Sequence, residues 1–447
     1  MDRSHQLGHE KISRLLIRLS LPATVAMIVN ALYNIVDSIF IGRGVGYLAI
    51  GGLTVAFPVQ MAVMALAQTI GIGGASAFSR HLGAGKREEA NQVAGNSFVM
   101  AMVLGLLICV LGMIMIHPIL RLFGATDVLM PYARDYLQVI LIGSLYFPFV
   151  MSTNNLIRAE GNARVAMFAM LLGTLTNIGL DYLFIFPLQM GIRGAALATI
   201  IAQFVSLVYV LRYLFGEHTV IKMKLQYLIP QWQIQKEILT VGSSSFGRQM
   251  AGSAMAIVLN NSLTYYGGEL ALAVFGIVHR VMMFLFMPMF GIVQGMQPIA
   301  GFNYGAKRMD RVKEVVRLSI IATTVIAAVS TIFGELFPGR IIRLFNDDPA
   351  LIESGIMALR IIIAMIPVVG IQIIGAALFQ SVGKALPALV LTLSRQIIFL
   401  IPMVLILPRI GQLGLLGIWL SFPIADLLST IFTSLWMRRE MKIMERE

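Results

Sequence analysis

The chain has 447 residues, of which 58% are hydrophobic and 13% are charged, and its mean hydropathy is +0.83. Soluble globular proteins carry about 25% charged residues, so this composition excludes that class and indicates a protein that crosses a membrane several times. The single cysteine, Cys109, excludes an intrachain disulfide and a cysteine-based metal site. The formal net charge of +12 would suit a nucleic-acid partner, but the distribution of the basic residues gives it another explanation.

Twelve hydrophobic runs are long enough to cross a bilayer as helices, which takes about 20 residues. They cover roughly residues 15–41, 50–80, 90–116, 128–156, 163–186, 191–215, 236–266, 270–302, 314–337, 350–382, 385–407 and 414–437. Of the 34 Lys and Arg residues, 23 lie at the termini and in the loops after even-numbered spans, and 6 lie in the other loops. The positive-inside rule therefore predicts that both termini are cytoplasmic, and we expect no nucleic-acid partner.

The chain also repeats itself. Five landmarks recur at separations of 221 to 223 residues, among them Arg121-Leu-Phe with Arg343-Leu-Phe and Lys86-Arg87 with Lys307-Arg308. Because each repeat contains six spans, an even number, both halves have the same orientation in the membrane. We therefore predict two six-helix bundles related by a pseudo-twofold axis along the membrane normal. The predicted organisation is an N-terminal bundle over 1–215, a cytoplasmic linker over 216–235 and a C-terminal bundle over 236–447. Two bundles with a cavity between them suit alternating-access transport.

An aspartate deep in the first run is the most informative residue in the sequence. A charged carboxylate near the centre of a span costs about 2.5–3.5 kcal/mol to insert, so Asp37 predicts a functional site. Asn34, Tyr33 and Asn30 precede it by three, four and seven residues, which places all four side chains on one helix face. The alternative is a structural hydrogen bond or ion pair between helices.

Other polar residues interrupt the later spans of the same half. Asn177 and Asp181 are one turn apart in the fifth span, with Thr174 on their side, and Thr199 and Gln203 are one turn apart in the sixth. In the fourth span Tyr136 precedes Asn154 by five turns and shares its face. Taken singly, each Asn or Thr is more simply read as a hydrogen bond between helices.

The two carboxylates, Asp37 and Asp181, would converge inside one bundle. Such a pair holds a proton at neutral pH, whereas the same oxygens joined by Asn177 and Thr199 would make a cage of hard ligands for Na⁺. We therefore predict that these four residues form the cation or proton site, with no other metal. We expect a substrate cavity lined by Asn30, Tyr33, Asn34, Tyr136, Asn154, Thr174 and Gln203.

The second half is not equivalent to the first. The interiors of its seventh and tenth spans contain no acidic residue, while Arg248, Arg280, Arg395, Glu335 and Asp426 lie in or near its apolar runs. We expect structural pairing here, with Arg395 and Asp426 as the obvious pair.

Motifs of soluble chemistry are missing from the sequence. There is no zincin motif and no P-loop, so we predict that the protein is not an enzyme, needs no cofactor and draws its energy from an ion or substrate gradient. An intramembrane protease or acyl transferase would need a nucleophile, base and metal set with recognisable spacing.

Several segments together resemble the multidrug and toxic compound extrusion (MATE) transporters over nearly the whole chain. They are Pro22, the segment Asn34-Ile-Val-Asp37-Ser-Ile-Phe-Ile-Gly42, the loop Gly83-Ala-Gly-Lys86-Arg87, Asn177 with Asp181, and the run Gly194-Ala-Ala-Leu-Ala-Thr199. The DinF-like branch of the family is the most similar. NorM-like members carry acidic residues in helices 7 and 10, which this chain lacks.

The resemblance implies export of organic, often cationic, hydrophobic compounds by H⁺ or Na⁺ antiport. It implies that Asp37, Asn177, Asp181 and Thr199 form the coupling site and that Pro22 helps the first helix bend. We expect a monomer in the cytoplasmic (inner) membrane of a prokaryote, with the lipid bilayer and small toxic compounds as its partners. The alternative is a flippase for a lipid or lipid-linked oligosaccharide, whose pyrophosphate would need cations such as Arg248, Arg280 and Arg395.

Overall fold

The computed structural model describes the backbone of residues 3–345 and 347–446 and, apart from positions 3–5, 34, 38 and 47, their side chains. Within these ranges the chain is helical and forms no strand. The helices of the first half are α1 (Arg3–His9), α2 (Ile12–Gly44), α3 (Tyr47–Gly83), α4 (Arg87–Ile114), α5 (Ile116–Leu122), α6 (Met130–Gly143), α7 (Phe147–Ala159), α8 (Ala163–Ile185) and α9 (Gly191–Leu214).

A connecting segment with one 3₁₀ turn, η1 (Leu225–Leu228), leads into the second half. Its helices are α10 (Trp232–Gly305), α11 (Met309–Leu336), α12 (Pro338–Arg343), α13 (Pro349–Ile363), α14 (Ile366–Ser381), α15 (Ala385–Leu393), the π-helical η2 (Ser394–Leu400), α16 (Ile401–Ile406), the 3₁₀ segment η3 (Leu407–Gln412) and α17 (Gly414–Met444).

The predicted twelve spans are confirmed. In the described part of the chain nine helical stretches are long and apolar enough to cross a membrane, and two bent pairs, α6 with α7 and α13 with α14, make eleven. The twelfth comes from α10, which is two helices joined at Gly268, where the backbone has φ 63° and ψ −159°. Glycine adopts such a conformation at little cost because it has no Cβ.

Prolines account for the two bent spans. The bends measure 50° between α6 and α7 and 49° between α13 and α14. Each second helix carries a proline in its first turn, Pro148 in α7 and Pro367 in α14. A proline has no N–H to donate to the preceding turn, so the helix restarts at this point in a new direction.

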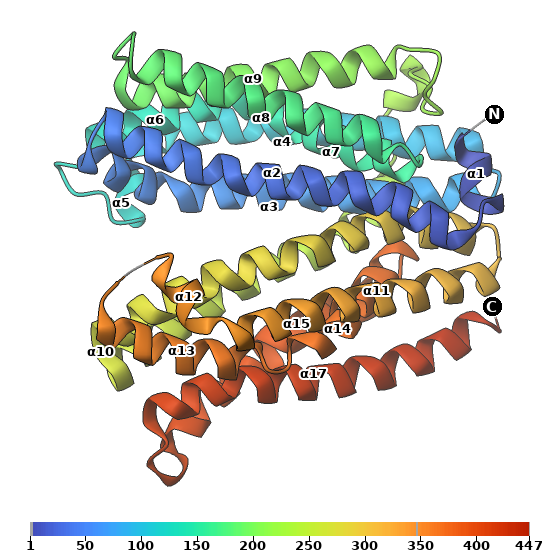
Figure 1. Ribbon diagram of the computed structural model, residues 1–447. Coiled ribbons are helices and arrows are strands. Elements are labelled where there is room, and N and C mark those ends of the chain that lie inside the picture. Colours follow the sequence, from blue (N-terminus) through green and yellow to red (C-terminus); the bar gives the residue numbers. More distant parts are fainter. Residues whose placement is uncertain (1–2, 346, 447) are drawn as a thin grey trace.

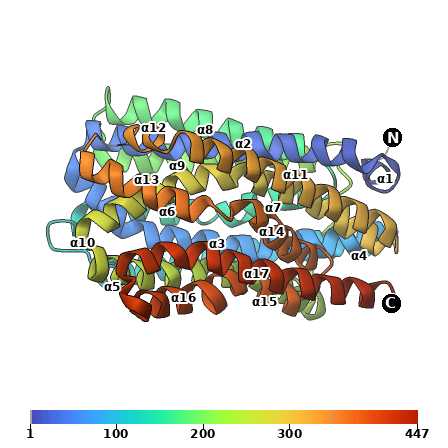
Figure 2. The same ribbon diagram turned by 60° about the horizontal axis from the view of Figure 1, so that its bottom comes forward.

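The helices form two groups. Figure 1 shows α1–α9 in the upper group and α10–α17 in the lower group, with both chain ends on the same side. Figure 2, the turned view, shows most helices running along one direction and again places both chain ends together. We call this end of the molecule, which holds α1 and the last turns of α17, the terminal end. The two groups match the predicted pair of bundles.

The two bundles lock together at the terminal end. A Cβ atom on Gly83 of α3 would lie 1.8 Å from the carbonyl oxygen of Phe302, and one on Gly242 of α10 would lie 2.0 Å from that of Thr69. These approaches are closer than any side chain permits, so glycine is required at these two points of contact between α3 and α10.

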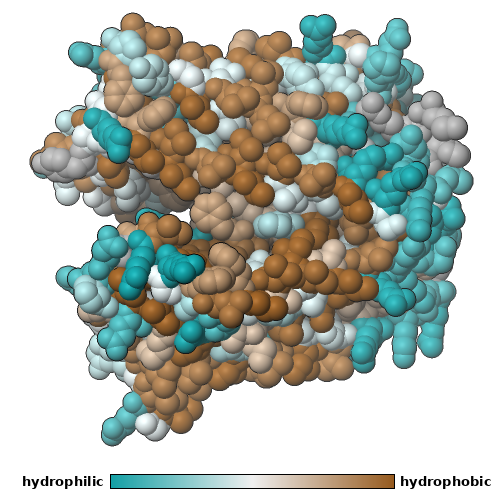
Figure 3. Space-filling view, viewed as in Figure 1, coloured by the Kyte–Doolittle hydropathy of each residue, from teal (hydrophilic) through white to brown (hydrophobic). Residues whose placement is uncertain are grey.

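The surface reflects the same arrangement. Figure 3 shows a broad apolar surface with hydrophilic residues gathered at the terminal end, and the molecule is hollowed between the bundles at the opposite end. An apolar belt with a polar cap suits a protein surrounded by lipid.

The first residues of the chain pack mainly on the second bundle, although Leu7 also shares a buried cluster with Ala163 of the first bundle. The Asn303 side chain donates from Nδ2 to the carbonyl oxygen of Leu7 (3.0 Å), and Arg311 donates from Nη2 to that of Glu10 (2.7 Å). Leu15 and the other apolar residues at the start of α2 share a buried cluster with residues of α10 and α11. The N-terminal segment therefore ties the two bundles together.

Candidate functional site

The polar residues that the sequence analysis singled out in the first half meet inside the N-terminal bundle. Asp37 projects from α2, Asp181 from α8 and Thr199 from α9, and the Asp181 side chain is fully buried. The carboxyl groups of Asp37 and Asp181 are hydrogen-bonded to each other, although 144 residues separate them in the chain. Two carboxyl groups approach so closely only when a proton or a cation offsets their repulsion.

Asn177 connects the cluster. One turn before Asp181 on α8, it is buried with an exposed fraction of 3%. In the amide orientation that satisfies both of its ends, its nitrogen donates to Tyr33 Oη (3.2 Å) and to Asp181 Oδ2 (3.1 Å), and its oxygen accepts from the backbone N–H of Thr199 (3.1 Å). The amide therefore joins α2, α8 and α9.

Two tyrosines cover the carboxyl pair. Tyr33, one turn before Asp37, is hydrogen-bonded to the Thr199 side chain. Tyr136 of α6 is buried, lies within electrostatic range of both aspartates and accepts a hydrogen bond from Nε2 of Gln60 (3.0 Å). Phenolic oxygens beside a carboxyl pair offer further hard ligands or a route for a proton.

Two oxygen atoms of the cluster are available for binding. Oδ1 of Asp37 and Oδ1 of Asp181 are buried and have no hydrogen-bond partner among the described residues. A buried carboxylate oxygen without a partner is costly unless it is protonated or holds a cation. The described residues hold no group of three or more His, Cys, Asp or Glu that would bind a transition metal. The donor set is therefore suited to H⁺ or Na⁺.

The other predicted cavity residues are more scattered. Asn154 of α7 is buried with Oδ1 lacking a partner in the part of the chain that the structure describes, and Thr174 of α8 is buried one turn before Asn177. Gln203 of α9 faces α6 at Gly143, whereas Asn30 is exposed on α2. The side chain of Asn34 lies outside the described residues.

Pro22 lies within an unbroken helix. Helix α2 runs from Ile12 to Gly44 with Pro22 inside it. Its neighbours Ser20 and Thr24 pack directly on Gly295 and Gly291 of α10. The proline is therefore positioned where α2 crosses onto the second bundle, and the helix passes it without a break in this conformation.

The second bundle contains the predicted ion pair. Arg395 of η2 donates from Nε to Oδ1 of Asp426 (2.5 Å) and from Nη2 to Oδ2 (3.3 Å). Asp426 is 1% exposed, so this is a buried, two-pronged contact. Glu335 is paired with Arg360 at 3.5 Å in a more exposed position.

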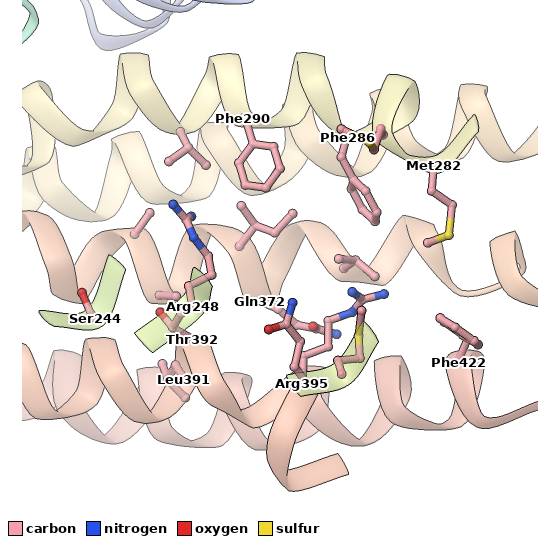
Figure 4. Close-up of a pocket in the computed structure, with 18 of the residues that line it drawn as sticks. Ser244, Arg248, Met282, Phe286, Phe290, Gln372, Leu391, Thr392, Arg395 and Phe422 are labelled. Atoms are coloured by element: carbon pink, nitrogen blue, oxygen red, sulfur yellow. The ribbon is translucent and has the colours of Figure 1, made fainter. Parts of the chain in front are cut away.

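A cavity of about 270 Å³ lies beside this pair. Its walls come from both parts of α10 and from α14, α15, η2 and α17, and they include Arg248 and Arg395 together with several Phe and Met residues. Figure 4 shows both arginines with Phe286 and Phe290 around it. Arg280, the third arginine of the flippase hypothesis, is not one of the lining residues.

Gln60 and Glu237 are two functional candidates that were not predicted from the sequence. Gln60 lies two residues after Pro58 in an apolar span, and a single polar side chain in such a span is the feature of the sequence that could have indicated it. Glu237, at the start of α10, forms an ion pair with Arg80 of α3 at 2.6 Å. Arg80 and Glu237 are 157 positions apart, and nothing in the local sequence indicates that they would meet.

Twelve membrane-spanning helices in two bundles, with a polar cluster inside one and a cavity inside the other, form the architecture of a membrane transporter. Comparison with known proteins gives the family. The sequence model of the MatE family matches twice, over residues 22–183 and 245–406, which repeats the pattern after 223 residues. The chain belongs to this family, the MATE transporters that its motifs resemble, and it is a membrane transporter rather than an enzyme.

The similarity extends over nearly the whole chain. The chain is 28% identical to the probable multidrug resistance protein NorM of Thermotoga maritima, and the alignment covers 98% of this chain and 96% of the relative. It is 25% identical to the multidrug export protein MepA of Staphylococcus saprophyticus, with 92% and 90% coverage. A solved structure of a multidrug resistance MATE family transporter of the MOP superfamily, in an outward-facing conformation, superposes with a TM-score of 0.94 at 29% identity and covers 99% of this chain and 98% of its own.

Proposed function

We propose that this protein exports organic, often cationic, hydrophobic compounds through alternating access, in exchange for H⁺ or Na⁺. The contact between Asp37 and Asp181 carries the proposal, because a carboxyl pair inside a membrane bundle responds to a proton or cation and to little else. The names of the NorM and MepA relatives support multidrug export.

The arrangement of the cluster favours H⁺ over Na⁺. A proton fits between two carboxyl oxygens that are already in contact, whereas Na⁺ would have to enter between them and gather further oxygens. Asn177, Thr199 and Tyr33 would supply those oxygens, so Na⁺ stays open as the alternative.

The conformation fits an outward-open state. The bundles are locked at the terminal end and hollowed at the other end, and the distribution of basic residues assigns the terminal end to the cytoplasm. Binding of H⁺ or Na⁺ at the carboxyl pair would change how α2 packs against α8 and α9, and α2 also contacts α10 of the second bundle. An ion site in one bundle would thus influence the interface between both.

We place the protein in the cytoplasmic membrane of a prokaryote as a monomer with no cofactor. The test is transport of ethidium in proteoliposomes with an imposed pH gradient or an imposed Na⁺ gradient, each alone. Uphill transport driven by one of the gradients supports antiport and identifies the ion. Ethidium that binds but is not moved uphill by either gradient would refute it.

The flippase hypothesis is less well supported. A pyrophosphate needs several free cations, but Arg395 is neutralised by Asp426 and Arg280 lies outside the cavity lining. Arg248, which has no ion-pair partner among the described residues, suits a smaller anionic group.

A further inference from the structure

The cavity of the second bundle has an uneven charge. Two arginines line it, and no carboxylate is among the described residues that do so. The carboxylate of Asp426 lies behind Arg395 and is almost completely shielded from solvent. The cavity therefore presents a net positive charge to whatever occupies it.

Arg248 is the source of this charge. It lies deep in the bundle yet is accessible from the cavity, and it makes no hydrogen bond or ion pair with any described residue. Its guanidinium carbon lies 5.9 Å from the centre of the Phe290 ring, a contact that orients the group but does not neutralise it. An arginine stays charged at physiological pH, and a charge at this depth needs a partner.

Arg395 is positioned as a second donor. Asp426 engages Nε and Nη2, while Nη1 has no hydrogen-bond partner among the described residues. Its guanidinium carbon lies 5.8 Å from the centre of the Phe286 ring. Figure 4 shows Arg248 and Arg395 from neighbouring elements with the two phenylalanines opposite them.

The rest of the lining combines uncharged polar side chains, such as Gln372 and Gln396, and the imidazole of His279 with apolar, adaptable side chains. Met255, Met282, Met283, Phe275 and Phe422 contribute flexible and aromatic surface. Ligand pockets of drug-sized molecules occupy about 300–1,000 Å³, and a cavity of about 270 Å³ would hold a small ring system with one charged group.

We propose that this cavity is a second substrate subsite, which binds amphipathic organic monoanions by placing their carboxylate, sulfonate or phosphate group against Arg248. Within the proposed export function, the carboxyl cluster of the first bundle would suit cations, and this cavity would suit anions. The two bundles would then differ in the sign of the charge that each accepts.

The test is equilibrium binding of matched dansyl probes to the purified protein in a neutral maltoside detergent. Dansylglycine carries a carboxylate, and dansylamide is a neutral analogue of the same ring. We expect Arg248→Gln to weaken dansylglycine binding by about ten- to a hundredfold, because a hydrogen bond to a charged group is lost, and to leave dansylamide nearly unchanged. Arg248→Lys should retain most of the affinity, and Arg280→Gln, which lies beyond Gly268 in the second part of α10 and outside the cavity lining, should behave like the wild type.

Equal affinity of dansylglycine for the wild type and a folded Arg248→Gln variant would overturn the proposal, as would equal affinity of the wild type for both probes. If Arg248→Gln does not fold, the wild type and Arg248→Lys decide the question. The proposal is sustained if both proteins bind dansylglycine more tightly than dansylamide. Displacement of dansylglycine by phosphatidylglycerol but not by phosphatidylcholine would identify a lipid as a source of the anion, and failure of both lipids would indicate soluble compounds.

This binding measurement needs no gradient. Arg248-dependent binding together with failed ethidium transport would refute the antiport proposal alone. Gradient-driven ethidium transport without anion binding would refute the subsite alone.

Discussion

Nη2 of Arg80 lies 2.6 Å from Oε1 of Glu237, so an ion pair joins the end of α3 in the first bundle to the start of α10 in the second. His81 lies 3.0 Å from Glu89 and 3.9 Å from Glu237, which extends the network. The pair is partly shielded, with side-chain exposures of 20% and 30%. It therefore stabilises the conformation in which the bundles meet at the terminal end.

Removing this ion pair should loosen the closed end. We expect Glu237→Gln to shift the equilibrium away from the closed terminal end by about two- to fivefold, which corresponds to about 0.5–1 kcal/mol for a partly exposed pair. The measurement is the rate at which a maleimide labels Ser79→Cys, a position that is 1% exposed at the interface, in a chain lacking Cys109. Glu440→Gln, whose partner Lys384 belongs to the same bundle, should leave the rate unchanged.

Substitution of Asp37 should impair ion coupling while leaving substrate binding nearly intact. Asp37→Asn keeps the shape of a protonated carboxyl group but removes the choice between two charge states. An ion shifts an equilibrium only through its different affinity for the two states, so uphill transport should fall by about tenfold or more while ethidium binding changes by less than about threefold. Anisotropy titration and proteoliposome uptake measure the two quantities. Full uphill transport by the variant would remove Asp37 from the coupling mechanism.

Substitution of Asp181 in the first bundle and of Asp426 in the second should have different effects on the protein. Asp181→Asn should abolish gradient-driven export, since Asp181 shares its charge with Asp37. Asp426→Asn leaves Arg395 without its partner in a buried position, which costs about 3–5 kcal/mol, so it should lower the melting temperature and the yield. Thermal unfolding and transport of the purified variants test both expectations. A stable Asp426→Asn protein that binds ethidium but does not couple would place the ion site in the second bundle instead.

Topology can be tested with single cysteines in a chain lacking Cys109. Arg43 and Asp310 are both exposed, and the positive-inside rule assigns them to opposite sides of the membrane. Cysteines at these positions should label from the outside and from the cytoplasm, respectively, with an impermeant maleimide. Labelling of both from one side would contradict the twelve-span topology.

Local sequence determined the spans, the repeat and the identity of the two coupling candidates. Hydropathy and helical periodicity act over a few turns, so the cost of a carboxylate in an apolar run can be recognised at Asp37 and at Asp181 separately. The family resemblance rests on segments that are equally short.

Tertiary packing alone decided which of these groups touch. Asp37 meets Asp181 and Gln60 meets Tyr136 because α2, α3, α6 and α8 pack side by side, and no spacing along the chain encodes those distances. The same holds for the arginines of the second half. Arg395 and Arg248 look alike in the sequence, but packing brings a buried carboxylate to the first and an open apolar cavity to the second. A charge in a membrane protein acquires its role from the partner that the fold supplies or withholds.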